Sequence, residues 1–505
     1  MDSWSSLMLG FGIALRPDNL LFALVGSIIG TAVGVLPGIG PIAAISILLP
    51  LTFHLDATGA IIMLGAIYYG AMYGGTVTSV LMNVPGEAAS AITAIDGHEM
   101  AKQGRAGSAL AIAAIGSFIG GSVATGFLVV AAPPLARVAL AFGPPEFFGL
   151  MMVGMTLLVG FSGGAPLLGF ISALFGLALS IPGTDLVEGT PRLTFGYAEL
   201  LEGIEFVPVI MGLYGIGEIL HNLEAKAGRV DLAKITSKLL TRKDISASAM
   251  PITRGTLIGI FCGLIPGIGT LLPTIISYAV EKRVSRHPEK FGAGAIEGVA
   301  GPETTNNAYA NGALIPLFTL GVPASPTIAV LLGAFMMNGL TPGPFLFQEK
   351  PDFVWAVIAS LYVGNVLLLV LNLPLVGMWV HLLRIPYSIL FPLIIAFTAV
   401  GSYTTRNSLF DLAVLIAFGI IGYVCKKIHF PVAPMAFTLI LGPLTEKALR
   451  QSLSMSGGDL SVLVRGPIST GLIVVAAVVL CSPLLRAAWQ RLTGRKAIDL
   501  PLVDN

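Results

Sequence analysis

Long apolar stretches recur along this chain, and short loops between them hold most of its charged residues. A helix needs roughly 20 mainly apolar residues to cross a bilayer, and backbone in lipid must satisfy its hydrogen bonds internally. The pattern predicts an all-α polytopic membrane protein. We expect about eleven spans, at residues 58–95, 108–135, 145–160, 164–181, 206–222, 297–340, 354–380, 386–402, 409–424, 430–443 and 467–485.

The composition excludes an ordinary soluble domain. Only 11% of the residues are charged, whereas soluble domains have roughly 25%. The net charge of +1 gives no sign of a nucleic-acid-binding surface. Cys262, Cys425 and Cys481 lie far apart, so we interpret them as small apolar residues of helices, without a disulfide or a metal site. The N-terminus lacks the basic region and small-residue cleavage site of a cleaved signal peptide.

Lys and Arg are enriched in cytoplasmic loops of membrane proteins, and this rule orients the predicted spans. The loops 96–107 and 223–250 and the C-terminal tail are basic, so we place them inside. The loops 183–205 and 341–353 are poor in Lys and Arg, so we place them outside. The C-terminus is therefore expected in the cytoplasm, whereas the side of the N-terminus is left open.

Two apolar segments, 18–53 and 251–280, are interrupted at their centres by the sequence PGIG. Basic loops flank 251–280 on both sides, so both of its ends are expected in the cytoplasm. A segment that begins and ends on one side is a re-entrant hairpin, with PGIG at its tip. Such irregular backbone is tolerated at membrane depth where it lines a cavity. The alternative is an ordinary span with a proline kink.

The chain also repeats itself. Residues 34–41 (GVLPGIGP) match residues 263–270 (GLIPGIGT), and Val84-Pro85 aligns with Val322-Pro323 at the offset that aligns Tyr73 with Asn311. The basic and charge-poor loops that follow the two PGIG segments exchange places, which predicts inverted repeats. We therefore divide the chain into an N-terminal segment (1–17), repeat 1 (18–222, with hairpin 18–53 and broken helix 58–95), a cytoplasmic linker (223–250), repeat 2 (251–445, with hairpin 251–280 and broken helix 297–340), and a C-terminal span and tail (446–505).

Each broken helix has about twice the length of one span, and glycine, proline and asparagine residues interrupt both. Neither contains Lys or Arg; their charged residues are Glu87, Glu297 and Glu303. A bound anion would rely on helix N-termini, hydroxyls and amides, and would need a co-transported cation. Na⁺ could bind backbone carbonyls near Gly38, Gly267, Asn83 and Asn306, or Glu303 could take up a proton.

The candidate substrate- and ion-binding residues lie at the hairpin tips and along the broken helices. They are Pro37, Gly38, Gly40, Thr76, Ser79, Asn83, Pro85, Gly86, Pro266, Gly267, Gly269, Glu303, Thr304, Asn306, Asn311, Pro323 and Ser325. For the glycines, serines and threonines the alternative is close helix packing, which small residues permit in membranes. We expect no catalytic residue and no cofactor. The expected coupling ion is Na⁺ or H⁺.

Enzymatic alternatives have little support in the sequence. The chain has no GxxxxGK[ST] phosphate-binding loop and no HExxH zinc motif. Gly160-Phe-Ser162-Gly resembles the serine motif of rhomboid proteases, but short glycine-containing matches are common in a chain with 61 glycines. No converging nucleophile and base accompany it.

Several strings resemble the large membrane subunit of the tripartite tricarboxylate transporter family. They are GVLPGIGPIAAISILLPLTF, YYGAMYGGTVTSVLMNVPGEAASAITAIDGHEMAKQGRAG, GLIPGIGT and GVPASPTIAVLLGAFMMNGLTPGPFLF. The resemblance runs from about residue 18 to residue 440. Asn83, Pro85 and Gly86 match the first family motif, and Gly38, Gly40, Gly267 and Gly269 match the hairpin tips. The second copy has Ala324 where the first has Gly86, so the side chains need not act symmetrically.

The resemblance implies a permease subunit in a bacterial inner membrane, paired with a small membrane subunit and a periplasmic solute-binding protein. It implies secondary active import of citrate-like tricarboxylates, or of dicarboxylates or aromatic acids, by cation symport. The plan is similar to that of the ion-transporter superfamily, with two hairpins and an elevator motion. The alternatives are a carboxylate transporter or exporter without a binding protein, a passive channel, and an intramembrane enzyme.

Overall fold

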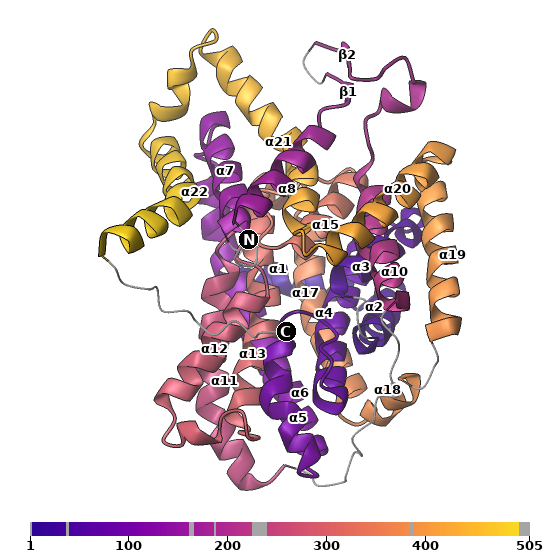
Figure 1. Ribbon diagram of the computed structural model, residues 1–505, viewed down its shortest axis with the longest axis vertical. Coiled ribbons are helices and arrows are strands. Elements are labelled where there is room, and N and C mark those ends of the chain that lie inside the picture. The colour runs from indigo at the N-terminus through magenta and orange to yellow at the C-terminus, as the bar shows by residue number, and fades with distance from the viewer. Residues whose placement is uncertain are drawn as a thin grey trace.

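The computed structural model describes residues 3–36, 40–160, 166–185, 188–224, 240–383 and 387–493. Within these ranges the chain is almost entirely helical (Figure 1), and its one strand pairing joins β1 (Gly183–Thr184) to β2 (Pro191–Arg192). The predicted all-α class is therefore confirmed. Pro37, Gly38, residues 161–165 and most of the predicted linker lie outside the described residues.

Six of the eleven predicted spans, 58–95, 108–135, 206–222, 354–380, 386–402 and 409–424, overlap described helices that could cross a membrane. Eight described helices are long and apolar enough to cross a membrane, and others such as α7 and α8 are apolar but shorter. In chain order the helical elements are α1 (Ser3–Ala14), α2 (Pro17–Val35), α3 (Pro41–Leu48), η1 (Leu49–His54), α4 (Ala57–Met82), α5 (Ala91–Lys102), α6 (Ala106–Ala139), α7 (Pro144–Gly160), α8 (Pro166–Leu179), η2 (Ala198–Leu200), α9 (Phe206–Ile210), η3 (Met211–Ile216), α10 (Gly217–Glu224), α11 (Arg242–Gly263), α12 (Leu271–Val284), η4 (Pro288–Lys290), α13 (Glu297–Gly312), α14 (Leu314–Leu320), α15 (Pro326–Met337), α16 (Leu346–Glu349), α17 (Pro351–Asn372), α18 (Val376–Leu382), α19 (Tyr387–Arg406), α20 (Leu409–Lys427), α21 (Ala433–Met455), η5 (Leu460–Val464) and α22 (Pro467–Thr493).

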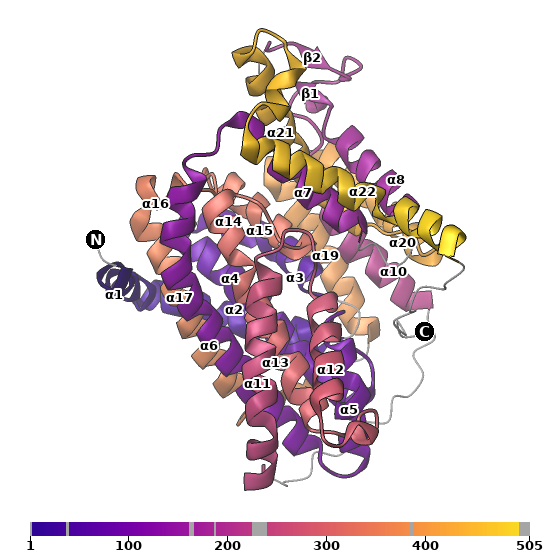
Figure 2. The same ribbon diagram turned by 90° about the vertical axis from the view of Figure 1, so that its left-hand side faces the viewer.

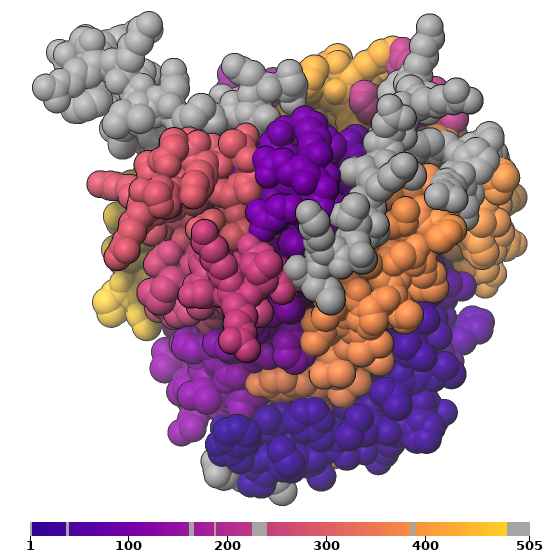
Figure 3. Space-filling model, turned by 90° about the horizontal axis from the view of Figure 1, so that it is seen from below, coloured from indigo at the N-terminus to yellow at the C-terminus, as the bar shows by residue number. Residues whose placement is uncertain are grey.

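Two predicted boundaries are wrong. Helix α11 begins at Arg242, so residues 242–250 are helix and not linker. Helix α5 covers Ala91–Lys102, so most of the predicted loop 96–107 is helical. The charge that suggested a loop is satisfied inside the protein: Asp96 is buried, and its Oδ1 accepts hydrogen bonds from the backbone N–H groups of residues 292, 294 and 295 at 2.8–2.9 Å. The end-on view shows the segment near residue 100 beside that near residue 290 (Figure 3).

A stripe of glycines packs α2 against α4. Gly26, Gly30 and Gly34 recur every fourth residue, and a side-chain carbon on them would lie 2.4, 2.4 and 2.3 Å from the carbonyl oxygens of Met63, Ile67 and Ala71. Small residues at this spacing allow membrane helices to approach backbone to backbone. The residue numbers of the glycines on α2 and of the carbonyl groups that they meet on α4 increase together, so α2 runs parallel to α4. Helix α3 and η1 then return the chain to the start of α4.

The second PGIG segment repeats this arrangement. Gly255, Gly259 and Gly263 recur at the same spacing on α11 and contact α13 at successive backbone positions from residue 301 to residue 312. Helix α11 therefore runs parallel to α13, and α12 returns beside it (Figure 2). Both segments follow the path of a hairpin that begins and ends beside the same end of the next long helix. Re-entry into a membrane stays a prediction.

The long helices of the two copies run in opposite directions. Thr76 of α4 contacts Glu303 of α13, and Tyr69, two turns earlier in α4, contacts Asn311, two turns later in α13. Rising residue numbers on one helix meet falling numbers on the other, so α4 and α13 are antiparallel. This is the relation between two copies of an inverted repeat, and it places their polar residues face to face.

Candidate functional site

Glu303 is buried where the two copies meet, with a relative exposure of 1%. Its Oε2 accepts a hydrogen bond from the Thr76 hydroxyl at 2.7 Å, and its Oε1 accepts one from the Thr93 hydroxyl at 2.5 Å. Thr76 lies on α4 and Thr93 on α5, so one carboxylate joins three helices. No ion pair among the described residues includes Glu303.

A second buried carboxylate, Glu87, lies in the break between α4 and α5. Its carboxylate accepts a hydrogen bond from the Asn306 side-chain amide at 2.5 Å. Asn306 lies about one helical turn after Glu303 on α13. The Ser79 hydroxyl donates to the Ser90 hydroxyl at 2.9 Å, and that hydroxyl donates to the Glu87 carbonyl. A side chain on Gly75 would meet Glu87 at 2.9 Å, so a glycine there makes room for the carboxylate.

Asn311 binds the two copies together two turns beyond Glu303. Its side-chain oxygen accepts hydrogen bonds from the hydroxyls of Tyr69 (2.8 Å) and Thr125 (2.9 Å), and its amide donates to the Asn307 carbonyl. Asn307 in turn donates to the Ser117 hydroxyl of α6 at 2.7 Å. The amide-rich face of α13 is therefore held by α4 and α6 rather than left free in lipid.

The second hairpin tip contacts the second helix break. Gly267 and Gly269 have φ angles of 77° and 74°, a left-handed conformation that favours glycine. The Ala324 carbonyl accepts hydrogen bonds from the Gly269 amide at 3.4 Å and from the Tyr309 hydroxyl at 2.9 Å. The tip predicted around Pro266 therefore lies against the break that contains Pro323.

The first copy has a similar contact with different details. A side chain on Gly86 would lie 2.2 Å from the Gly34 carbonyl oxygen, so the first break presses on the end of α2. Gly40 adopts φ −69° as the residue before α3, unlike its counterpart Gly269. Pro37 and Gly38 lie outside the described residues, so the predicted cation ligands near Gly38 stay a prediction.

Other predicted site residues are placed in local roles. The Thr304 hydroxyl donates to the Ala300 carbonyl of its own helix at 2.7 Å, and the Ser325 hydroxyl accepts from the Ile328 amide at 3.3 Å as the N-cap of α15. Asn83 and Pro85 are exposed. Asn83 ends α4 with φ 56° and ψ 28°, a conformation that asparagine tolerates better than most residues.

Sequence reasoning missed several residues of the buried cluster. Glu87 was noticed as a charge but not assigned to the site, although it stands in the motif Asn83-Val-Pro-Gly-Glu87. The other missed residues are Tyr69, Ser90, Thr93, Ser117 and Thr125. Ser90 contacts residues close to it in the sequence. The contacts of Tyr69, Thr93, Ser117 and Thr125 join positions up to 242 residues apart, so no local pattern could have found those four.

Glu87, Glu303 and Asn306 form a group called here the carboxylate cluster. Its chemistry suits the binding of a cation or a proton. Its partners are neutral hydroxyls and amides, and the Asn306 side-chain oxygen and the Tyr68 hydroxyl have no hydrogen-bond partner among the described residues. A void of about 10 Å³ lies beside Thr76, Ser117 and Asn372, close to the space that one water molecule needs. The described residues form no group of three or more His, Cys, Asp or Glu side chains suited to a metal ion.

Two known proteins of Agrobacterium vitis are similar in sequence to this chain. Over 476 residues, 94% of this chain and 95% of the relative, it is 47% identical to an "Uncharacterized 52.8 kDa protein in TAR-I ttuC' 3'region" of Agrobacterium vitis. It is 46% identical over 227 residues to an "Uncharacterized protein in TAR-II ttuC' 3'region" of the same organism, covering 45% of this chain and 94% of that relative. No solved structure matches.

The family comparison covers both repeats and the whole carboxylate cluster. Residues 20–437 match the sequence model of the tripartite tricarboxylate transporter TctA family. The matched residues include both PGIG segments, both breaks and α13. This chain belongs to the tripartite tricarboxylate transporter TctA family, and is therefore a multi-pass membrane subunit of a transporter.

Proposed function

We propose that this chain is the translocating subunit of a binding-protein-dependent secondary transporter that imports tri- or dicarboxylates by cation symport. In this proposal it works in a bacterial inner membrane with its C-terminus in the cytoplasm. A small membrane subunit and a periplasmic solute-binding protein complete the system. Family membership supports the transporter class and makes these partners the first to test.

The observation that carries cation coupling is the pair of buried carboxylates without a basic partner. Glu87 and Glu303 are 6% and 1% exposed, and a charged carboxylate is costly to bury unless a counter-charge accompanies it. A carboxylate substrate adds further negative charge at the same membrane depth. Binding of Na⁺ or H⁺ at this cluster offsets both charges, so substrate and cation stabilise each other's binding.

The contacts between helix breaks and PGIG segments support a proposal for how the protein moves. In the first copy the helix break lies against the end of α2, at Gly86–Gly34, and in the second copy it lies against the hairpin tip, at Ala324–Gly269. Both contacts rest on backbone atoms and glycines rather than on interlocked side chains. We propose that hairpins and breaks move as one body past the remaining helices in an elevator motion, with substrate held at the breaks.

Uptake by proteoliposomes tests the proposal directly. Vesicles would contain this chain with its small subunit, the binding protein would be added outside, and labelled citrate and dicarboxylates would be offered under an imposed Na⁺ or proton gradient. We expect accumulation that requires both the binding protein and one of the two gradients. Uptake that ignores both gradients contradicts symport, and uptake without the binding protein contradicts the tripartite assignment.

A further inference from the structure

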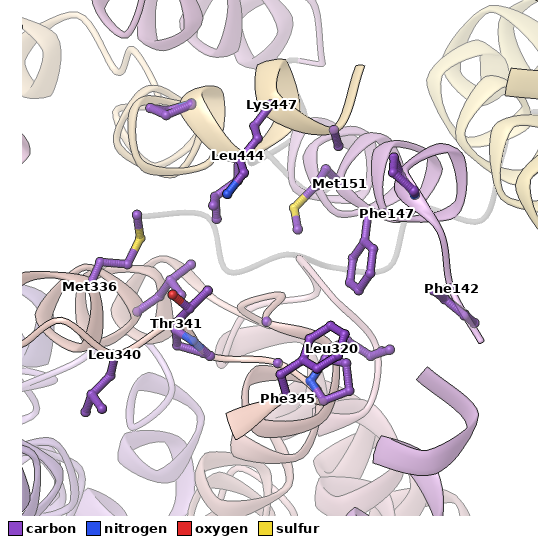
Figure 4. A pocket seen from close by; sticks show the side chains of 18 of the residues that line it. Phe142, Phe147, Met151, Leu320, Met336, Leu340, Thr341, Phe345, Leu444 and Lys447 are labelled. Carbon is purple, nitrogen blue, oxygen red and sulfur yellow. The ribbon is translucent and has the colours of Figure 1, made fainter. Parts of the chain in front are cut away.

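A cavity of about 830 Å³ opens between α21, the turn joining α6 to α7, and the segment after α15 (Figure 4). Its walls are mainly apolar, and the rings of Phe142, Phe147 and Phe345 contribute to them. Cavities of roughly 300–1,000 Å³ with apolar walls and a few polar groups are typical small-molecule sites. The size and lining suit an organic molecule with an apolar body the size of a ring.

Lys447 gives this cavity one fixed positive charge. No other Lys or Arg of the described chain lines it, and the ammonium group of Lys447 has no ion-pair partner among the described residues. Its neighbours on α21 are paired: Glu446 binds Arg192 at 2.6 Å, and Arg450 binds Asp185 at 2.8 Å. The side chain extends past Leu444 toward the open space (Figure 4). The carboxylate of Glu349 also lines the cavity, but it forms no ion pair with Lys447, so the ammonium group can meet an anion.

The cavity adjoins the second helix break. Leu320 and Gly321 line it, and Gly321 ends α14 with φ 69° directly before the Val322–Ala324 segment that touches the hairpin tip. The other lining segment, residues 339–345, belongs to the region predicted to begin the external loop 341–353. On α21, Glu446 and Arg450 on either side of Lys447 form ion pairs with Arg192 and Asp185 of the predicted external loop 183–205. The cavity is therefore on the predicted external side of the break.

We propose that this cavity is the first substrate-binding site on the external side, with Lys447 binding a carboxylate and the aromatic walls holding an apolar body. The proposal rests on the proposed function and adds a substrate class to it. A carboxylate carried on an aromatic or similar ring fits the apolar walls. Citrate fits less well than an aromatic dicarboxylate, because its hydroxyl and two remaining carboxylates would lose water without gaining partners there, whereas the aromatic ligand leaves only one carboxylate without a basic partner.

Direct binding to the full-length chain in lipid nanodiscs tests this without the other subunits. The probes are labelled benzene-1,2-dicarboxylate and citrate, each measured between low and high salt. We expect the aromatic dicarboxylate to bind more tightly than citrate, with an affinity that falls as salt rises. Lys447→Gln should weaken it about fivefold and remove the salt dependence, as expected for one partly exposed ion pair.

Three further variants separate the charge of Lys447 from general effects. Lys447→Arg should keep the affinity, Glu349→Gln in the same lining should not weaken it, and Lys282→Gln on α12 should change nothing. Equal affinity in Lys447→Gln and the unchanged chain overturns the proposal, as does tighter binding of citrate or no binding of either probe. None of these outcomes bears on gradient-driven uptake in proteoliposomes, so failure here and failure of the proposed function are distinguishable.

Discussion

Asn83 and Gly321 end α4 and α14 in the same left-handed conformation, with φ angles of 56° and 69°, and each is followed by Val-Pro. The two breaks therefore share a backbone geometry that asparagine and glycine both adopt, while most other residues resist it. This relation gives the exposed Asn83 a conformational reason to be there, separate from any ligand role of its side chain.

Replacing Asn83 distinguishes these two roles. We expect Asn83→Gly to keep transport, because glycine adopts the left-handed conformation and leaves nearby carbonyl ligands in place. Asn83→Val should lower the free energy of unfolding by about 1–2 kcal/mol, since a β-branched residue is strained there. Uptake and thermal unfolding of the purified variants would be measured together. Loss of transport in a stable Asn83→Gly protein would show that the amide side chain binds substrate or ion.

Glu303→Gln tests cation coupling. The glutamine amide keeps the size of the carboxyl group and one oxygen that can accept from the hydroxyls of Thr76 and Thr93. Unlike the carboxyl group, it carries no negative charge and does not bind a proton. We expect gradient-driven accumulation to fall at least tenfold, while exchange of internal for external substrate continues. The measurement is paired uptake and counterflow in proteoliposomes.

Glu297→Gln is the matched control for that prediction. Glu297 lies in the first turn of the same helix and is only partly buried, so its neutralisation should leave accumulation unchanged. Accumulation that survives in Glu303→Gln at normal expression would remove Glu303 from the coupling site. Equal losses in both variants would indicate a general effect of charge on α13.

Glu87 and Asn306 should be energetically coupled. Asn306→Ala leaves the buried Glu87 carboxylate without its amide donor, which costs about 1–3 kcal/mol when the group stays buried. Glu87→Gln in the same background should recover part of that loss, because a neutral group is cheaper to leave unpaired. A double-mutant cycle by thermal or denaturant unfolding measures the coupling. Additive single effects would mean that the 2.5 Å contact contributes nothing to stability.

The features found from sequence were those encoded by neighbouring residues. Pro-Gly pairs and the matched strings around residues 34–41 and 263–270 located both PGIG segments, both breaks and the repeat. The nature of α5 was missed, because Asp96 was read as a loop charge and its partners lie 196–199 residues away. Glu87 was missed for the same reason, since its amide partner is 219 residues distant. Lys447 was missed because it lies on α21, outside both broken helices.

The glycine stripes make a final prediction that compares two glycines, one of α2 and one of α4. A side-chain carbon on Gly30 would lie 2.4 Å from the Ile67 carbonyl oxygen, whereas Gly65 has nothing within 4 Å. Gly30→Ala should separate α2 from α4 and destabilise the protein by about 1–3 kcal/mol, as overpacking does. Gly65→Ala should stabilise it by up to about 1 kcal/mol, because alanine favours a helix over glycine.

The second copy provides an internal check of the same idea. Gly259, also the middle glycine of its stripe, would place a side-chain carbon 2.6 Å from the Thr305 carbonyl oxygen, so Gly259→Ala should cost about as much as Gly30→Ala. Thermal unfolding of the three variants in one detergent decides the matter. If Gly259→Ala were as harmless as Gly65→Ala, the two hairpins would not depend on the same backbone contact. The repeat would then be one of sequence and path, but not of packing.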